Sequence, residues 1–165
     1  MRTLIAAAFL LVGAGFVTGQ DDEEKYTDKA GKYSIVFPAG AKVMKMSQDQ
    51  GGLKMYTAAA ESKGNAFVIM YADFPAEVKD VDPKIIFDGA QKGAAGDGKV
   101  TSSKDLTHGT KKYPAREIVI DKGGMKLRAR IILANTRMYI AIVGGGEDFA
   151  DSSEAKAFIK SLELK

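Results

Sequence analysis

The sequence predicts an α+β domain, with an antiparallel β-sheet of about six to seven strands flanked by helices. Three observations support this class. Segments of alternating apolar and polar residues are separated by turn residues, only two segments have helical spacing, and a Gly-Gly pair at 123–124 links two strands whose side chains match across the turn. Successive strands with few helices between them are typical of antiparallel sheets.

The N-terminal segment predicts export. Arg2 precedes an apolar run over residues 4–17, which is followed by small residues and an acidic cluster. This pattern is typical of a signal peptide, and the run is shorter than the ~20 residues of a membrane-spanning helix. We expect a signal peptide at 1–19, a loose polar arm at 20–32 and a single α+β domain at 33–165. The exported chain is then periplasmic or secreted, with no membrane span.

The composition of the 165-residue chain argues against several function classes. It has 24 Lys and Arg against 21 Asp and Glu, and the expected signal peptide contains only Arg2, which leaves 23 against 21. Nucleic-acid binding needs a concentrated basic excess, so we expect none. One His and no Cys supply no ligand set for zinc, and the acidic clusters lack the spacing of a calcium loop. We expect neither a metal nor another cofactor.

The first half of the domain predicts three strands. Residues 33–38 alternate in polarity, and Pro38 ends the strand because it has no N–H to donate. Residues 53–60 and 66–72 flank a turn-like segment at 61–65, so they are expected to form a hairpin. Residues 66–72 are apolar on both sides, which places this strand inside the sheet.

Two helices are expected. One starts at Asp82-Pro83, because the aspartate can cap free N–H groups and proline suits the first helical position, and it runs to about residue 95. The other follows a capping pair within residues 151–154. Its apolar stripe has helical spacing and consists of Ala155, Phe158, Ile159 and Leu162.

The register of a three-stranded meander follows from its turns. A two-residue loop at Gly123-Gly124 pairs residues on either side, and a second tight turn at Asn135-Thr136 extends the pattern. The expected pairs are Asp121 with Lys126, Ile120 with Leu127, Ile118 with Ala129, Glu117 with Arg130, Leu133 with Met138, Ile131 with Ile140 and Ala129 with Ile142. Charged residues meet charged ones and apolar residues meet apolar ones, and a slip of one residue would destroy this agreement.

The meander contains the candidate binding residues. Lys126, Arg128 and Arg130 alternate along one face, where Asp121 and Glu117 are expected to pair with the first and the last. Arg128 instead faces Val119 and Val143. If this face contacts a partner, the expected residues are Arg128, Arg130 and Tyr139. The Gly-rich run at 144–146 lacks the Lys of a phosphate-binding loop and is expected to be a flexible connector.

His108 is the only histidine and lies in the segment THGTKKYPARE at 107–117. A nucleophilic site would need it beside a serine such as Ser102 or Ser103 and an acid such as Asp105, yet no Gly-x-Ser-x-Gly motif exposes a serine. Pro114 suits the beginning of a strand. The segment is therefore expected to be a strand-to-strand connection with no catalytic residue.

Five short motifs, spread over the expected domain, carry a family resemblance. They are GKYSIVFP at 31–38, VIMYADFP at 68–75, YPARE at 113–117, RMY at 137–139 and FIKSL at 158–162. Together they resemble the PsbP-like superfamily, which groups photosystem II extrinsic subunits, a Ran-binding nuclear-import factor and bacterial envelope proteins. The resemblance implies an α/β/α sandwich, and it implies docking onto larger partners rather than catalysis.

Three functions follow as hypotheses. The first is a non-enzymatic exported domain that docks onto a protein or another component of the cell envelope. The second is a carrier with a small-ligand pocket between sheet and helix, suggested by the alanines at 58–60 and 94–95. The third, least favoured, is a hydrolase-type enzyme that uses His108. The sequence indicates neither the partner nor the oligomeric state.

Overall fold

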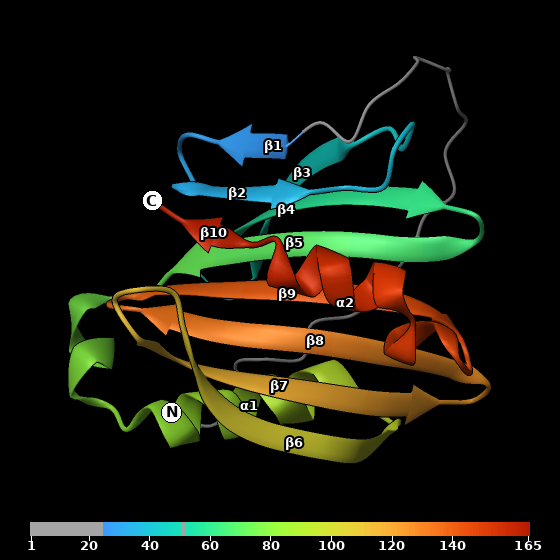
Figure 1. Ribbon diagram of the computed structural model, residues 1–165. Coiled ribbons are helices and arrows are strands. Elements are labelled where there is room, and N and C mark those ends of the chain that lie inside the picture. Colours follow the sequence, from blue (N-terminus) through green and yellow to red (C-terminus); the bar gives the residue numbers. More distant parts are fainter. Residues whose placement is uncertain (1–24, 51) are drawn as a thin grey trace.

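The computed structural model describes residues 25–50 and 52–165 (Figure 1). The expected signal peptide, its cleavage site and residues 20–24 lie outside the described residues. In chain order the elements are β1 (Lys25–Asp28), β2 (Tyr33–Val36), β3 (Met44–Gln50), β4 (Leu53–Ser62), β5 (Asn65–Asp73), η1 (Ala76–Asp80), α1 (Pro83–Ala95), β6 (Lys99–His108), β7 (Tyr113–Lys122), β8 (Met125–Ala134), β9 (Arg137–Gly146), η2 (Phe149–Asp151), α2 (Ser153–Lys160) and β10 (Glu163–Leu164).

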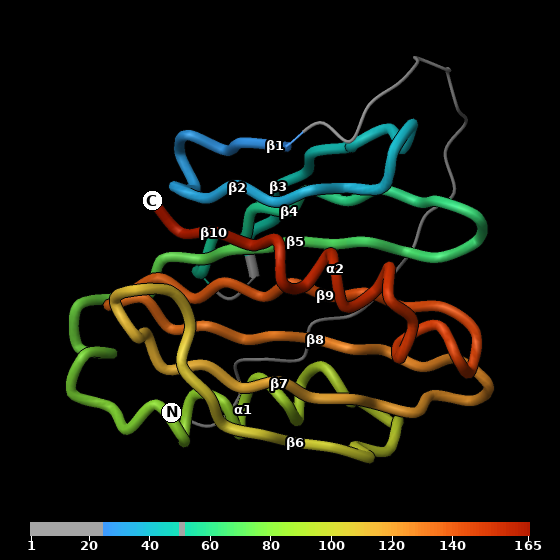
Figure 2. The backbone as a smooth tube through the Cα atoms, viewed as in Figure 1, coloured from blue at the N-terminus to red at the C-terminus, as the bar shows by residue number. Residues whose placement is uncertain are grey.

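Seven strands form the main sheet in the order β3-β4-β5-β9-β8-β7-β6, with every neighbouring pair antiparallel (Figure 2). The class expected from the sequence, an antiparallel sheet flanked by helices, is confirmed. The β4–β5 hairpin is also confirmed, and β5 lies between β4 and β9, inside the sheet as expected.

The meander register is confirmed for every expected pair of β7, β8 and β9, from Asp121 with Lys126 to Ala129 with Ile142. Gly123 and Gly124 have φ of 58° and 86°. A type I′ hairpin turn, whose twist matches that of the flanking strands, requires positive φ at both central residues. Glycine adopts such angles without strain. The local turn chemistry therefore fixes the pairing of these strands.

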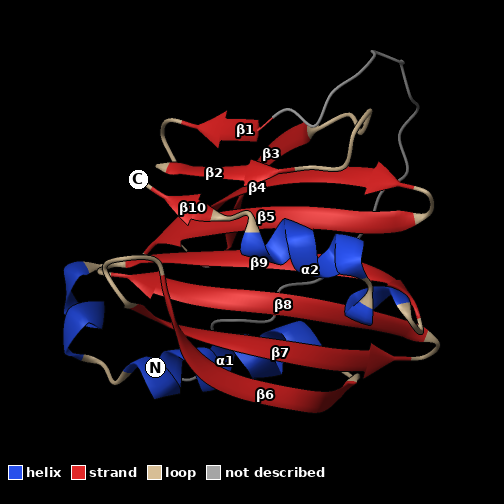
Figure 3. Cartoon of the chain, in the orientation of Figure 1, coloured by secondary structure: helices blue, strands red, loops and turns tan. Residues whose placement is uncertain are grey.

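The two faces of the main sheet are covered by different elements (Figure 3). The aromatic face, which carries Phe67, Tyr71 and Tyr139, packs against α2 and against a small sheet of order β1-β2-β10. The opposite face carries Met55, Met70 and Met138 and packs against α1; we call it the methionine face. This layering is the expected α/β/α sandwich with a small second sheet added on one side.

Both helices begin at polar caps. On each face of the sheet, one arginine forms an ion pair with the helical layer that covers that face. Asp82 accepts a hydrogen bond from the N–H of Lys84 at the start of α1, as expected, whereas Ser152 rather than Asp151 caps α2. On the methionine face, Arg116 pairs with Asp88 of α1. On the aromatic face, Arg128 pairs with Asp151 just before α2.

Two expectations are corrected by packing. The loose arm expected at 20–32 includes strand β1, which pairs with β2 because Tyr26 packs edge-on against Phe37 at 5.7 Å between ring centroids. The run Gly144-Gly145-Gly146 is the end of β9 rather than a flexible connector. A side chain on Gly145 would meet the ring of Phe149 at 2.7 Å, so this strand needs glycine for close packing.

The two edge strands of the main sheet, β3 and β6, were not expected from the sequence. Their residues are mostly polar and exposed. A strand with solvent on much of its surface lacks the apolar alternation from which strands are recognised. The expected connection around His108 is confirmed at Gly109–Lys112, but His108 itself is the last residue of β6.

Candidate functional site

A pocket of about 310 Å³ lies at the end of the molecule where several turns meet. Its lining comes from the β1–β2, β6–β7 and β8–β9 turns and from the C-terminal strand. The lining residues are Lys32, Asp73, Lys111, Tyr113, Ala134, Asn135, Thr136, Arg137, Tyr139, Leu164 and Lys165. We call this site the basic pocket.

The turns around the basic pocket hold residues in a rare backbone conformation. Lys32, Lys112 and Asn135 have φ of 55°, 53° and 60°, in the left-handed region that side chains other than glycine seldom adopt. Such conformations persist only where surrounding contacts fix them. The positions of the pocket lysines therefore depend on well-defined turns rather than on loose loops.

Arg137 is the most strongly held charge of the pocket. Its Nε and Nη2 atoms donate to the two carboxylate oxygens of Asp73 at 2.5 and 2.6 Å, and Nη1 donates to the carbonyl oxygen of Ala30 at 2.8 Å. The guanidinium also lies over the ring of Tyr71 at 4.8 Å. The hydrogen bonds from Arg137 lower the pKa of Asp73 below its ordinary value, so the pair stays ionised at neutral pH.

Tyr139, one of the expected binding residues, lies in this pocket but is almost fully buried. Its hydroxyl donates to the carbonyl oxygen of Gly31 at 2.7 Å, which joins the main sheet to the β1–β2 turn. Burial raises the pKa of Tyr139, so the hydroxyl stays protonated as a donor. The residue thus supports the floor of the pocket.

Arg128 and Arg130, the other two expected binding residues, share one acid. Arg128 donates to Glu117 at 2.6 Å and Arg130 donates to the same carboxylate at 2.7 Å. Arg128 also donates to the carbonyl oxygen of Ala150 at 2.6 Å and pairs with Asp151. Both guanidiniums are thus engaged within the chain, outside the basic pocket. Burial opposes ionisation of Glu117, but the hydrogen bonds from the two arginines outweigh it and lower its pKa.

The lysines give the basic pocket its net charge. Within residues 25–50 and 52–165, no acidic side chain lies within ion-pairing distance of Lys32, Lys111 or Lys165. Among the lining side chains, four are basic and one is acidic, Asp73, which Arg137 already neutralises. The pocket therefore presents uncompensated positive charge, beside the aromatic ring of Tyr113.

The residues of the basic pocket, Tyr139 apart, were not singled out from the sequence. The expected register of the meander already places Tyr113 beside the turn at Asn135, since Ala115 pairs with Ile132. That signal could have located part of the site. Lys32 and Lys165 could not be found this way, because they come from a separate small sheet.

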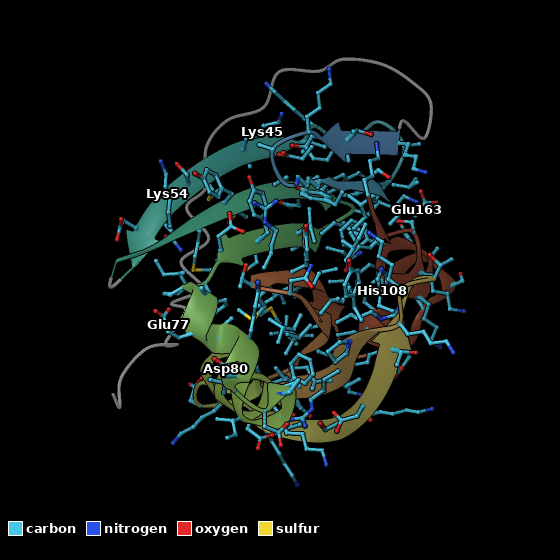
Figure 4. All side chains as sticks on the ribbon, turned by 90° about the vertical axis from the view of Figure 1, so that its left-hand side faces the viewer. Lys45, Lys54, Glu77, Asp80, His108 and Glu163 are labelled. Atoms are coloured by element: carbon cyan, nitrogen blue, oxygen red, sulfur yellow. The ribbon has the colours of Figure 1, made fainter. Side chains whose placement is uncertain are left out.

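His108 lies apart from the serines and the acid that the hydrolase hypothesis would need. It lies on the aromatic face with Leu106, whereas Ser103 and Asp105 point to the other side of β6. Ser102 shares the face of His108 but is six residues away along the strand, roughly 20 Å at ~3.3 Å per residue. Asp105 instead pairs with Arg116 at 2.6 Å. Figure 4 shows His108 on the same side of the sheet as Glu163, away from Glu77 and Asp80 of η1. Burial, aided by the charge of Arg130, lowers the pKa of His108, so the ring is neutral at pH 7.

A second hollow, of about 580 Å³, lies between α2, the segment after β2 and the β4–β5 turn. This is the place where the carrier hypothesis put a ligand, between sheet and helix. The alanines that suggested it do not line the hollow. Its three phenylalanines, Phe37, Phe67 and Phe158, are each at most 3% exposed and pack against one another. These rings form the packed base of the hollow rather than its open wall.

In the described part of the chain, no three or more His, Cys, Asp or Glu side chains come together in a group able to hold a metal ion. Within the same residues, no helix combines the length and the apolar character needed to cross a membrane.

Comparisons with known proteins bear on the fold. Family models gave no match, and neither did curated protein sequences. Among solved structures, the chain is similar to cyanobacterial PsbP (CyanoP) from Synechocystis sp. PCC 6803, with a TM-score of 0.63 and 12% identity, over 92% of this chain and 98% of that one. At this identity the likeness concerns the fold alone, and it confirms the expected resemblance at that level. The chain has a PsbP-like fold.

Proposed function

We propose that this protein is an exported, non-enzymatic docking domain that binds an acidic segment of a protein partner in the basic pocket. The observation that carries the proposal is the set of three lysines, Lys32, Lys111 and Lys165, which form no ion pair within residues 25–50 and 52–165 and surround the fixed Arg137 and the ring of Tyr113. Arginine and tyrosine are enriched in protein interfaces. Asp73, the acidic side chain in the lining, is paired with Arg137, so the lysines offer the carboxylates of a partner a complementary charge that steers association.

The arrangement of the pocket favours recognition over chemistry. Arg137 is fixed by Asp73 and by the carbonyl oxygen of Ala30, so it positions a ligand without rearranging. No nucleophile with an adjacent base lines the pocket, and His108 is not among its residues. The PsbP-like fold fits this role, because the family resemblance of the sequence implies action by docking. Export rests on the signal-peptide pattern of residues 1–19.

Arg128 and Arg130 remain predicted contacts for a partner, but we rank them below the lysines of the basic pocket. Both already donate to Glu117, so a partner would have to compete with this carboxylate for them. In the described part of the chain no carboxylate pairs with the lysines of the basic pocket, which is why they are placed first.

A defined acidic peptide tests the proposal. A short poly-glutamate peptide titrated into the isotope-labelled protein should shift the amide signals of the turns at 29–32, 109–112 and 135–136. The affinity should fall as salt rises, because screening weakens exposed charge pairs beyond a Debye length of about 8–10 Å. In the double variant Lys32→Glu/Lys111→Glu, binding should fall by about tenfold or more, since 1.4 kcal/mol corresponds to a factor of ten.

The matched control is Lys63→Glu/Lys104→Glu, which makes the same charge change away from the pocket. Lys63 lies in the β4–β5 turn and Lys104 on β6, both exposed. If this control weakens binding as much as the pocket variant, the peptide responds only to net charge and the proposed site is wrong. Equal binding by the pocket variant and the unmodified protein would reject the docking role of the lysines.

A further inference from the structure

Methionine side chains gather on one face of four neighbouring strands. The strand register places Met44 and Met46 of β3, Met55 of β4, Met70 of β5 and Met138 of β9 on the methionine face. Met46 lies in one cross-strand row with Thr57 and Met70, and Met55 lies in the next row with Ala72 and Met138. The four residues Met46, Met55, Met70 and Met138 therefore zigzag across adjacent strands, with Met44 one step further along β3.

Each consecutive pair in this zigzag is a diagonal neighbour. Diagonal partners in an antiparallel sheet have Cα atoms about 7–8 Å apart and stay within reach of long side chains. Methionine has three rotatable bonds, so its sulfur can move towards a common centre. Thr57 lies between Met46 and Met70 in their row. The side chains of Met46, Met55 and Met70 can thus converge above Thr57.

The cluster is open on one side and mostly buried on the other. Met46 is 54% exposed and Met44 is 41% exposed, whereas Met55 and Met70 are 8% and 9% exposed. α1 packs on β7 and β8 rather than on β3. Core packing accounts for the buried methionines but not for two exposed ones on an edge strand, where charged residues are the usual protection against aggregation. The exposed pair gives an ion access to the buried pair.

The chemistry of the cluster selects one class of ligand. Thioether sulfurs are soft, neutral donors, and soft donors favour Cu(I) over zinc, magnesium or calcium. The described residues hold no competing group of His, Cys, Asp or Glu for harder metals. The apolar neighbours Ala59 and Ala72 disfavour a doubly charged ion, because the cost of burying charge is high.

We propose that the methionine face binds one soft monovalent cation, Cu(I), through the thioethers of Met46, Met55 and Met70, with Met44 and Met138 beside them. The site is independent of the proposed docking function. Arg137 and Tyr139 of the basic pocket belong to the aromatic face, on the other side of the sheet. Failure of either proposal leaves the other untouched.

The test uses the untagged chain and two probes, Ag(I) and Cu(I), the latter kept reduced in the absence of oxygen. Native mass spectrometry should show one bound ion. The ¹³C-labelled methyl signals of Met46, Met55 and Met70 should shift on titration. Met46→Leu should weaken binding by about tenfold or more in competition with a Cu(I) chelator, since even groups that only support a metal's ligands are worth about 10–100-fold in affinity.

Met125→Leu is the matched control. Met125 has the same face and is 48% exposed, but it pairs with Gly146, eight residues along β9 from Met138. At ~3.3 Å per residue this is roughly 26 Å, beyond any shared coordination. The control should bind like the unmodified protein. Met46→Leu changes an exposed side chain, so folding should be unaffected; far-UV circular dichroism checks this for each variant.

Three results would overturn the site: no bound Ag(I) or Cu(I), equal affinity in Met46→Leu and the unmodified protein, or an equal loss in Met125→Leu. Zn²⁺ should leave the methionine methyl signals in place. If Zn²⁺ shifts them as Ag(I) does, the assignment to a soft thioether site is wrong.

Discussion

The two faces of the main sheet are packed by different kinds of side chain. On the aromatic face, the ring pairs formed within the described residues interlock, as when Phe67 meets Phe149 and Phe158 at nearly right angles. The methionine face is filled mainly by aliphatic and methionine side chains, its buried ring Phe87 forms no ring pair within the described residues, and part of the face is open at β3. The same seven strands thus carry one face of directional contacts and one of adaptable contacts.

This difference indicates where side-chain positions are fixed and where they can adjust. Aromatic rings prefer particular mutual orientations, and buried tyrosines also need hydrogen-bond partners such as the Gly31 carbonyl oxygen for Tyr139. Methionine packs without such constraints and fills irregular space. The basic pocket lies beside the first kind of packing and needs fixed positions, while the proposed ion site lies in the second and needs side chains that can converge.

The largest effect should come from removing a ring on the aromatic face. Phe67→Ala is expected to lower the free energy of unfolding by about 3–5 kcal/mol, because Phe67 is fully buried and loses both ring partners. Met70→Leu, three residues along β5 on the other face, should cost less than about 1.5 kcal/mol. Urea unfolding measures both. Equal losses would show that the methionine face is as rigidly packed as the aromatic one.

Two adjacent glycines of β9 compare the two faces at matched positions, with a smaller expected loss of stability. Gly145→Ala is expected to cost about 1–3 kcal/mol, because the new methyl group meets Asn65 and the Cβ of Phe149, which is tied to the backbone. Gly144→Ala points to the methionine face and meets only a terminal methyl group of Leu127, at 2.5 Å, which can turn away. Thermal unfolding should rank the first substitution as the more harmful. The reverse ranking would contradict the proposed difference in rigidity.

The charged network of the aromatic face should make stability depend on pH. Glu117→Gln is expected to cost about 1.5–3 kcal/mol at pH 7, the worth of hydrogen bonds to charged groups. The folded-state pKa of Glu117 lies below its ordinary value of 4.5, so the stabilisation is complete above that value and is lost as the pH falls through the folded pKa. Unfolding followed from pH 7 to acid should show the variant and the unmodified protein converging. A constant gap would exclude this ion pair as the cause.

The smallest effect concerns one hydrogen bond. Tyr139→Phe keeps the ring but removes the bond to the Gly31 carbonyl oxygen, and it should cost about 0.5–1.5 kcal/mol. Hydrogen exchange should quicken at the β1–β2 turn more than in α1. Uniform quickening in both places would mean that Tyr139 supports the whole fold rather than this turn.

Some of the fold could be predicted because its signals are local. The meander register followed from two turns and from matched side chains such as Glu117 opposite Arg130, and the start of α1 followed from Asp82 and Pro83. The edge strands β3 and β6 escaped prediction because one side of an edge strand faces solvent and tolerates polar residues. Of the residues of the candidate site, the sequence indicated only Tyr139, because the lysines of the site come from segments far apart in the sequence.

The sequence by itself determined the class of the fold, the register of β7, β8 and β9, the β4–β5 hairpin and the start of α1, because turns, caps and alternation act over a few residues. Only the tertiary structure decided that Lys32, Lys111 and Lys165 meet, and that Arg128 and Arg130 share Glu117. It also decided that the methionines of β3, β4, β5 and β9 are neighbours on one face, because β9 lies beside β5 although η1, α1, β6, β7 and β8 separate them in chain order. The physical reason is that contacts between separate hairpins depend on how whole faces pack, and no short stretch of sequence encodes that.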